Sequence, residues 1–503
     1  MLYPLSYEGS PSWYVGAASS MHRVVPNLLR PMTTSFYEPL SYLDASFLAL
    51  ESPSSHMHVA GVALYEAGPL KLPDGGIDIE RIKSHINSKL QYIPRYRQRL
   101  AYVPVTRHPV WIDDEHFTFD YHVRHTSLPK PGDDEQLKRL AGRIVSQQLD
   151  RGKPLWELWV VEGLENDRFA LVAKIHHCMI DGVSGVDLTT ILLNLQPTPV
   201  IEPTPDWHPR PHPTESELAV SQTAKSLRRA IDTLTHAGKL VREGKLITET
   251  TLRKARAVSY SLRSGWLSTA AHTPLNDEIG SNRRFDWTQT NLNDIKDLRK
   301  ATGSSVNDVV LAIVAGAVRS FLQNHRDFDV TDVDFRIMNP VSTRSADQRG
   351  SLGNQVAMWL VSMPIDESDP LKRLRLIQDE TTRLKKTDQA LGAATLVDLS
   401  RGTPLTVLSL ASRWAGRAIR PFNMTVTNVP GPQFPLYLLE ARMLASIPIV
   451  PLWAHHGVGI ALFSYDGTLL WGIHSDYDAL PDSDHLIAAI HDSLSELKAA
   501  ASI

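Results

Sequence analysis

The stretch KIHHCMIDGVSG, residues 174–185, holds two adjacent histidines, an aspartate four residues after the second, and then a glycine. Both histidines lie near the end of the apolar run FALVAKIHHC (169–178), which predicts a buried strand. Neighbouring side chains of a strand point to opposite faces, so His176 and His177 should not bind one metal ion together. The pattern therefore argues against a zinc site and favours acid–base chemistry by one histidine.

A histidine at a strand end can serve as a general base without a protein nucleophile. A neutral imidazole can take a proton from a substrate hydroxyl, amine or thiol that attacks an activated acyl group. Asp181 would fix the local backbone, and Gly182 would allow the tight bend. The alternative is a buried histidine pair with a purely structural role, and the spacing alone leaves it open.

The chain lacks the sequence motifs of serine hydrolases, zinc proteases and nucleotide-binding proteins. The stretch GVSGV (182–186) has valine where a serine-hydrolase elbow needs its last glycine, and the chain has no HExxH, P-loop or GxGxxG pattern. Cys178 is expected to be a core thiol that points away from His177, as neighbouring strand residues do.

Strand-like and helix-like stretches alternate on both sides of the histidines. The first half has expected strands at 58–68, 155–164 and 169–178, with expected helices at 79–90 and 135–149. The second half has expected helices at 304–322 and near the C-terminus, expected strands at 333–341 and 354–365, and a hairpin that turns at Asp466-Gly467. This alternation predicts a mixed α/β (α+β) protein.

A connector separates the two halves. It begins with the proline-rich stretch 197–213, which a regular element would not tolerate, and continues as a basic stretch expected to be helical. Its cations are Lys225, Arg228, Arg229, Lys239, Arg242, Lys245, Arg253, Lys254, Arg256 and Arg263. Either this stretch lies on an anionic membrane or lipid surface, or it is a solvated helical bridge between domains.

Length and composition bound the remaining possibilities. A chain of 503 residues predicts two domains, and 42% hydrophobic residues with a formal net charge of −3 give no sign of a nucleic-acid binder. We expect an extension at 1–39, a first domain at 40–196, the connector at 197–283 and a second domain at 284–503. The apolar run Val309 to Val318 is too short to span a bilayer, and no secretion signal is recognisable.

A series of motifs resembles one family of acyltransferases. HHCMIDG (176–182) matches the HHxxxDG signature of the CoA-dependent acyltransferase superfamily, which also contains nonribosomal-peptide condensation domains. Seven further stretches are similar to motifs of the bacterial, especially actinobacterial, wax ester synthase/diacylglycerol acyltransferase family. They are LSYLDASFL (40–48), PLWELWVVEGL (154–164), Pro274–Asn276 with Arg283-Arg284, SVNDVVLA (305–312), NPVSTR (339–344), GSLGNQVAMWLVSMP (350–364) and TVTNVPGP (425–432).

The resemblance implies a fold and an activity. The fold would be two chloramphenicol-acetyltransferase-like domains with the active-site channel at their interface. The activity would be transfer of a long-chain acyl group from acyl-CoA to diacylglycerol, or to long-chain alcohols as in wax ester synthesis. Acyl-CoA would be a co-substrate, and neither a cofactor nor a metal ion would be needed.

The resemblance also implies roles for particular residues. His177 would be the general base, with His176 beside it, and Asp181 would be structural, with Arg344 as a candidate ion-pair partner. Pro154, Leu155 and Trp156 would shape the wall near the site, although strand packing explains them equally well. Asn307 and Asp308 would order the domain interface, although N-terminal helix capping is an equally good explanation.

Two alternative functions remain at this point. One is a condensation-type enzyme that takes acyl groups from a carrier protein, and the other is a non-enzymatic protein that binds lipid droplets. For the leading function we expect a cytoplasmic protein on the inner face of the membrane or on lipid droplets. Its partners would be acyl-CoA, the acceptor alcohol and the lipid surface, with no nucleic acid.

Overall fold

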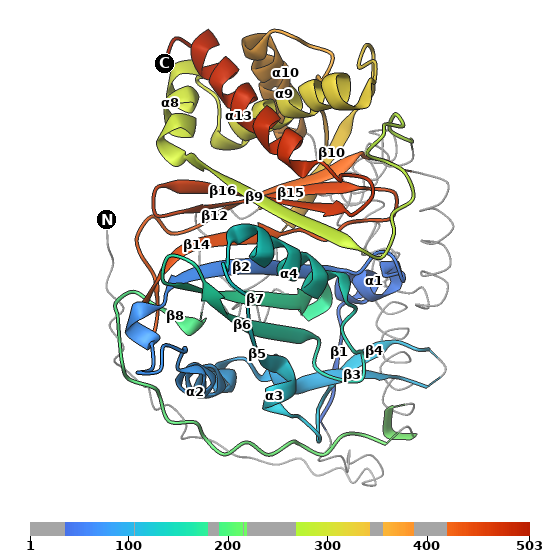
Figure 1. Cartoon of the computed structure of the whole chain (residues 1–503). Coiled ribbons are helices and arrows are strands. Elements are labelled where there is room, and N and C mark those ends of the chain that lie inside the picture. Colours follow the sequence, from blue (N-terminus) through green and yellow to red (C-terminus); the bar gives the residue numbers. More distant parts are fainter. Residues whose placement is uncertain are drawn as a thin grey trace, which may run out of the picture. The chain divides into compact units, whose positions relative to one another are not determined.

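The computed structural model describes residues 36–104, 106–179, 191–214, 216–218, 268–342, 356–386 and 420–503. All of them belong to one compact unit, Ser35–Ile503. Within it, two large sheets lie next to each other, and helices cover the outer face of the sheet formed by the second half of the chain (Figure 1).

Within the described residues, the first large sheet has seven strands and contains the histidine strand near its centre. Its order is β5 (Val123–Ser127), β6 (Trp156–Leu164), β7 (Arg168–His176), β2 (His58–Glu66), β14 (Ala441–Ile449), β13 (Tyr437–Leu438) and β8 (Leu193–Asn194). The strands β2, β6 and β7 are rich in Val, Leu, Phe and Ala and are almost wholly buried. β7 pairs antiparallel with β2, where His58 lies opposite the last residue His176, and with β6, where the pairing ends at Ile175.

Helices and smaller elements complete the first half. They are α1 (Tyr42–Leu50), α2 (Ile79–Lys89), α3 (Phe119–His122) and α4 (Asp134–Ser146), the 3₁₀ turns η1 (Gly68–Leu70), η2 (Leu90–Tyr92), η3 (Pro94–Arg97) and η4 (His177–Met179), and a three-stranded sheet of β1 (Glu38–Pro39), β4 (Pro109–Asp113) and β3 (Gln98–Tyr102). Asp133 caps α4 by accepting a hydrogen bond from the backbone of Gln136. At the other end of α4, the buried Lys174 ammonium donates to the carbonyls of Ile144 and Gln147, both at 3.0 Å. These contacts hold α4 against the histidine strand.

The second large sheet has six strands. Its order is β11 (Val356–Ser362), β10 (Arg336–Ser342), β12 (Met424–Pro430), β15 (Val458–Tyr465), β16 (Thr468–Asp476) and β9 (Arg283–Asn291). The helices α8 (Leu292–Thr302), α9 (Val306–Arg326), α10 (Pro370–Lys386) and α13 (Ser483–Ala500) pack with this sheet around one apolar core. α9 is the one described helix long and apolar enough to span a membrane, but 72% of that stretch is buried inside the protein. It is therefore the core helix of the second half.

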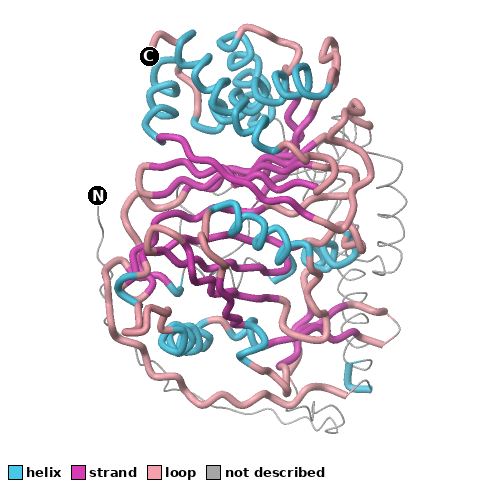
Figure 2. The backbone as a smooth tube through the Cα atoms, viewed as in Figure 1, coloured by secondary structure: helices cyan, strands magenta, loops and turns pink. Residues whose placement is uncertain are grey.

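The strand β14 joins the two halves, because it comes from the second half of the sequence and pairs with β2 of the first. Figure 2 shows the two layers of strands lying close together. A Cβ atom at Gly472 in β16 would collide with the carbonyl oxygen of Pro448 in β14, so glycine is required where the sheets approach each other. The two sheets are therefore in direct contact at this glycine.

The α/β fold class predicted from the sequence is confirmed. The expected helices at 79–90, 135–149 and 304–322 correspond to α2, α4 and α9, and the hairpin turns at Asp466-Gly467 between β15 and β16. The expected strand at 169–178 ends earlier, at His176, because a 3₁₀ turn begins at the next residue. The domain bounds remain a prediction, to which the structure adds that β13 and β14 belong to the first sheet.

Candidate active site

The two histidines lie at the junction of a strand and a turn. His176 is the last residue of β7, and His177 is the first residue of η4. The backbone N–H of His177 donates to the carbonyl of Met57 at 2.7 Å, which ties the turn to the residue before β2. The turn, and not strand alternation alone, therefore gives the two rings their different surroundings.

His177 lies in an apolar setting that keeps its ring neutral. The ring stacks on Phe47 of α1, with centroids 3.9 Å apart and planes 21° apart. Burial lowers the pKa of His177 to about 4, and a contact with its own backbone acts in the opposite direction. Nδ1 is buried and has no hydrogen-bond partner among the described atoms, so we assign the role of proton acceptor to the other ring nitrogen, Nε2.

His176 holds the turn in place and is only 1% exposed. Its Nδ1 accepts a hydrogen bond from the backbone N–H of Cys178 at 3.1 Å. Because Nδ1 accepts this bond, the ring proton is on Nε2, which lies 3.7 Å from a carboxylate oxygen of Glu51. His176 is therefore a positioning residue for the turn that carries His177.

Glu51 is a buried carboxylate that the sequence analysis did not identify. It lies 3.7 Å from both His58 and His176, and the guanidinium of Arg151 donates to it. Burial opposes ionisation of Glu51, but His176 and Arg151 outweigh it and hold the pKa of Glu51 well below its usual range. An acidic residue directly after the apolar stretch FLAL was the available signal, but Arg151 and His176 lie a hundred or more residues away in sequence.

The PLW residues contact the histidine strand. The carbonyl of Leu155 accepts a hydrogen bond from the backbone of His176 at 2.9 Å. The Trp156 indole donates to the carbonyl of Tyr96 at 2.8 Å, and its ring stacks on His122 with centroids 4.7 Å apart. Pro154, Leu155 and Trp156 are all buried, so these contacts fit strand packing beside the histidines, and their role in the site stays a prediction.

Cys178 is a core thiol, as expected, but for a different reason. It lies in η4 and not on the strand, and its side chain is 1% exposed. Burial raises the pKa of Cys178 well above its usual range, so the thiol stays protonated. The expectation that strand geometry turns it away from His177 was therefore wrong in its premise.

Asn307 and Asp308 lie in the first turn of α9. Asp308 forms a reciprocal capping box with Ser305, in which the two backbone–side-chain hydrogen bonds measure 3.2 and 2.9 Å. Asp308 also accepts a hydrogen bond from the Thr381 hydroxyl of α10 at 2.8 Å. The capping box supports the helix-capping role of Asp308. The bond from Thr381 links Asp308 to α10, within the second half of the chain.

Several predicted residues lie outside the described part of the chain. They are Asp181, Gly182, Arg344 and every cation of the connector from Lys225 to Arg263. Their predicted roles stay predictions.

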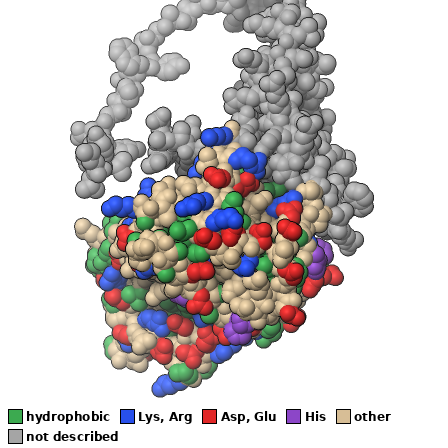
Figure 3. Space-filling view, turned by 90° about the horizontal axis from the view of Figure 1, so that it is seen from above, with side chains coloured by type: hydrophobic (Ala, Val, Ile, Leu, Met, Phe, Trp, Pro, Cys, Tyr) green, Lys and Arg blue, Asp and Glu red, His purple; other side chains and the backbone are tan. Residues whose placement is uncertain are grey.

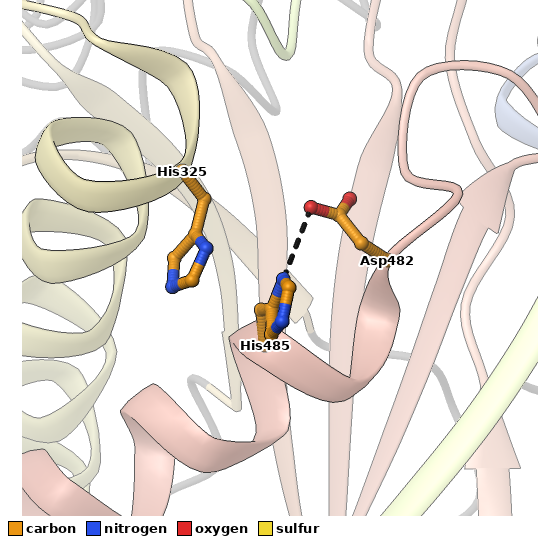
Figure 4. A group of neighbouring side chains, drawn as sticks. All are labelled: His325, Asp482 and His485. Atoms are coloured by element: carbon orange, nitrogen blue, oxygen red, sulfur yellow. Dashed lines mark hydrogen bonds and ion pairs between the residues drawn. The ribbon is translucent and has the colours of Figure 1, made fainter.

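Among the described residues, one group of three side chains could hold a metal ion. His325, Asp482 and His485 come from the end of α9 and the start of α13, with ligand atoms within 4.8 Å of one another (Figure 4). The two rings are stacked, with centroids 4.1 Å apart, so their ring planes are nearly parallel and do not converge on one point. Asp482 is already paired with Arg326 at 2.6 and 2.9 Å, and we assign the group to the packing of the two helices.

Comparisons with known proteins identify the family of the chain. Residues 40–310 match the model of the wax ester synthase/diacylglycerol acyltransferase catalytic domain, and residues 352–498 match the C-terminal domain of the same family. The chain is similar to a probable diacylglycerol O-acyltransferase of Mycobacterium tuberculosis, with 32% identity over 469 residues that cover 92% of this chain and 96% of the relative.

Two solved structures are among those that resemble the chain. A wax ester synthase/diacylglycerol acyltransferase from Marinobacter aquaeolei VT8 has 25% identity and a TM-score of 0.63, covering 92% of this chain and 100% of that one. The first condensation domain of the calcium-dependent antibiotic synthetase has 14% identity and a TM-score of 0.56, covering 93% of this chain and 97% of that one. The second likeness extends to the fold alone.

Proposed function

Because the chain belongs to the wax ester synthase/diacylglycerol acyltransferase family, we propose that it transfers a long-chain acyl group from acyl-CoA to an alcohol. The acceptor is diacylglycerol, which gives triacylglycerol, or a long-chain alcohol, which gives a wax ester. The observation that carries this proposal is the match of both halves of the chain to the family, with the histidine pair at the centre of the catalytic-domain match.

The geometry suggests how the reaction proceeds. Nε2 of neutral His177 takes the proton of the acceptor hydroxyl as its oxygen attacks the thioester carbonyl. The tetrahedral intermediate collapses, the carbon–sulfur bond breaks, and the leaving CoA thiolate receives the proton from His177. No covalent enzyme intermediate forms. The donor that stabilises the oxyanion has no assigned residue.

A purified-protein assay tests the proposal. Palmitoyl-CoA is supplied with dipalmitoylglycerol, with hexadecanol, with an aminoacyl thioester or without acceptor, and both thiol release and lipid product are measured. We expect thiol release that depends on an alcohol acceptor and equals the ester formed. Transfer only to the aminoacyl acceptor would favour a condensation enzyme, and no reaction with any acceptor would contradict acyl transfer from CoA.

We further propose that the protein works as a peripheral protein on the inner membrane face or on lipid droplets. Both lipid substrates partition into membranes, and the connector carries ten cations between Lys225 and Arg263 against few carboxylates. Binding to anionic liposomes should weaken as salt rises, because salt screens exposed charges. Changing Arg228, Arg229, Arg253 and Lys254 to Glu should release the protein at low salt. Equal co-sedimentation of the variant and the wild type would show that the connector only bridges the domains.

A further inference from the structure

A cavity of about 580 Å³ lies between α4 of the first half and the start of β9 in the second. Its volume falls in the range of small-molecule sites, ~300–1,000 Å³. Five cationic side chains line it, against the two carboxylates of Glu135 and Asp286. The five are Lys138, Arg139, Arg143, Arg283 and Arg284.

Three of these cations lack an acidic partner among the described residues. Lys138 is paired with Glu135 and Asp286, both at 2.6 Å, and Arg283 with Asp476 at 3.4 Å. Arg139 and Arg143 are exposed on α4, and no described carboxylate lies within ion-pair distance of either. The third is Arg284, for which no described carboxylate lies within ion-pair distance either.

Arg284 lies beside an aromatic ring and has an unpaired hydrogen-bond donor. Its guanidinium lies over the ring of Tyr477 at 4.7 Å, and its buried Nε has no hydrogen-bond partner among the described atoms. Tyr477 is 50% exposed and lines the same cavity. An unpaired buried donor is costly unless a ligand satisfies it, so the group is suited to an anion.

The positive charge of the cavity is a local feature. The whole chain has a formal net charge of −3. On the face of the molecule seen in Figure 3, Lys and Arg side chains are interspersed with Asp and Glu, as on an ordinary soluble surface. A group of arginines without carboxylate partners therefore indicates a ligand with several negative charges.

The inner wall of the cavity adjoins the loop between α1 and β2, whose Met57 carbonyl accepts a hydrogen bond from the backbone of His177. The guanidinium of Arg283 donates to the carbonyl of Ser54, which lies between Glu51 and His58. Its backbone N–H donates to the Ser146 hydroxyl at the end of α4, at 2.9 Å. A ligand whose charged end occupied the cavity could extend past Arg283 toward this loop.

We propose that this cavity binds the phosphates of the acyl-CoA donor, namely the 3′-phosphate and diphosphate of its nucleotide. Arg139, Arg143 and Arg284 contact the phosphate oxygens, and Tyr477 offers a ring face to the adenine. This inference rests on the proposed function, since it assigns a subsite for its donor. The remainder of the donor then extends inward toward the turn that carries His177.

The test compares the double variant Arg139→Ala/Arg143→Ala with the wild type and with Arg375→Ala, an exposed arginine of α10 outside the cavity. Titration calorimetry measures binding of CoA and of 3′-dephospho-CoA. We expect the double variant to bind CoA at least about tenfold more weakly and to lose the preference for the 3′-phosphate, because charge-assisted hydrogen bonds are lost. Arg375→Ala should bind like the wild type.

Kinetics add a readout that a folding defect would not reproduce. In the double variant, KM for palmitoyl-CoA should rise while kcat changes little, and the rate with palmitoyl-N-acetylcysteamine, which lacks the nucleotide, should be retained. Unchanged CoA binding in the double variant would overturn the proposal, whether or not the wild type shows transferase activity. Loss of binding to phosphatidylglycerol vesicles with CoA binding intact would also overturn it, and would assign the cavity to lipid headgroups.

Discussion

Replacing His177 with alanine is expected to reduce kcat for acyl transfer by about 10²–10⁴, the range typical of a lost general base. The ring stacks on Phe47, and burial keeps it neutral, so it can accept a proton at neutral pH. Alanine removes the proton acceptor but leaves the backbone hydrogen bond to Met57 in place. The rate should therefore fall strongly, while the thermal stability changes little.

His176→Ala is the matched comparison, because it changes the neighbouring residue of the same type. It removes the acceptor for the Cys178 N–H and the partner of Glu51, so it should lower stability and impair activity in parallel. Thermal melting and steady-state rates of both variants measure the difference. A His177→Ala enzyme with the wild-type rate would mean that another group takes the proton.

Acidification from pH 7.5 to 5.5 is expected to destabilise the protein by about 5.5 kcal/mol through four buried histidines. Burial lowers the pKa of His122, of His177 and of His456 to about 4, and that of His474 to about 3. The unfolded chain, with pKa values near 6.5, therefore binds protons that the folded protein excludes. The stability is fully present above pH 6.5 and is lost as the pH falls toward the folded pKa values.

Each buried histidine should contribute about 1.4 kcal/mol of this loss at pH 5.5, one unit below the ordinary pKa. His474→Gln provides the control, because the amide can still donate to the Val450 carbonyl that His474 contacts at 2.6 Å. Urea denaturation at the two pH values should show a smaller pH dependence for this variant. Equal unfolding free energies at pH 5.5 and 7.5 for the wild type would show that these rings are protonated in the folded protein.

Much of the fold could be predicted because local patterns encode it. Apolar periodicity located α2, α4 and α9, and the pair Asp466-Gly467 located the turn of the second-half hairpin. The placement of β14 beside β2 could not be predicted in this way, because the choice of strand partner depends on contacts between distant parts of the chain. The turn at His177 was missed because the apolar run continues through Cys178 and Met179, where the backbone has already left the strand.

The sequence predicted the type of chemistry at the site but only some of the residues that surround the histidines. The motif identified His176 and His177, but it gave no indication of Phe47, Glu51 or Arg151. Phe47 belongs to the stretch LSYLDASFL, which we used only for the resemblance. Glu51 and Arg151 are a hundred residues apart in sequence, and only the folded chain shows that they form one buried group.

The central claim is that the neutral ring of His177 is the general base, and the pH dependence of kcat/KM tests it most directly. This parameter reports the pKa of the essential base in the free enzyme. Since burial lowers the pKa of His177 to about 4, kcat/KM for palmitoyl-CoA should stay level from neutral pH downward throughout the range in which the protein remains folded. An acid limb with its midpoint at or above pH 6.5, recorded on protein shown to be folded, would contradict the account.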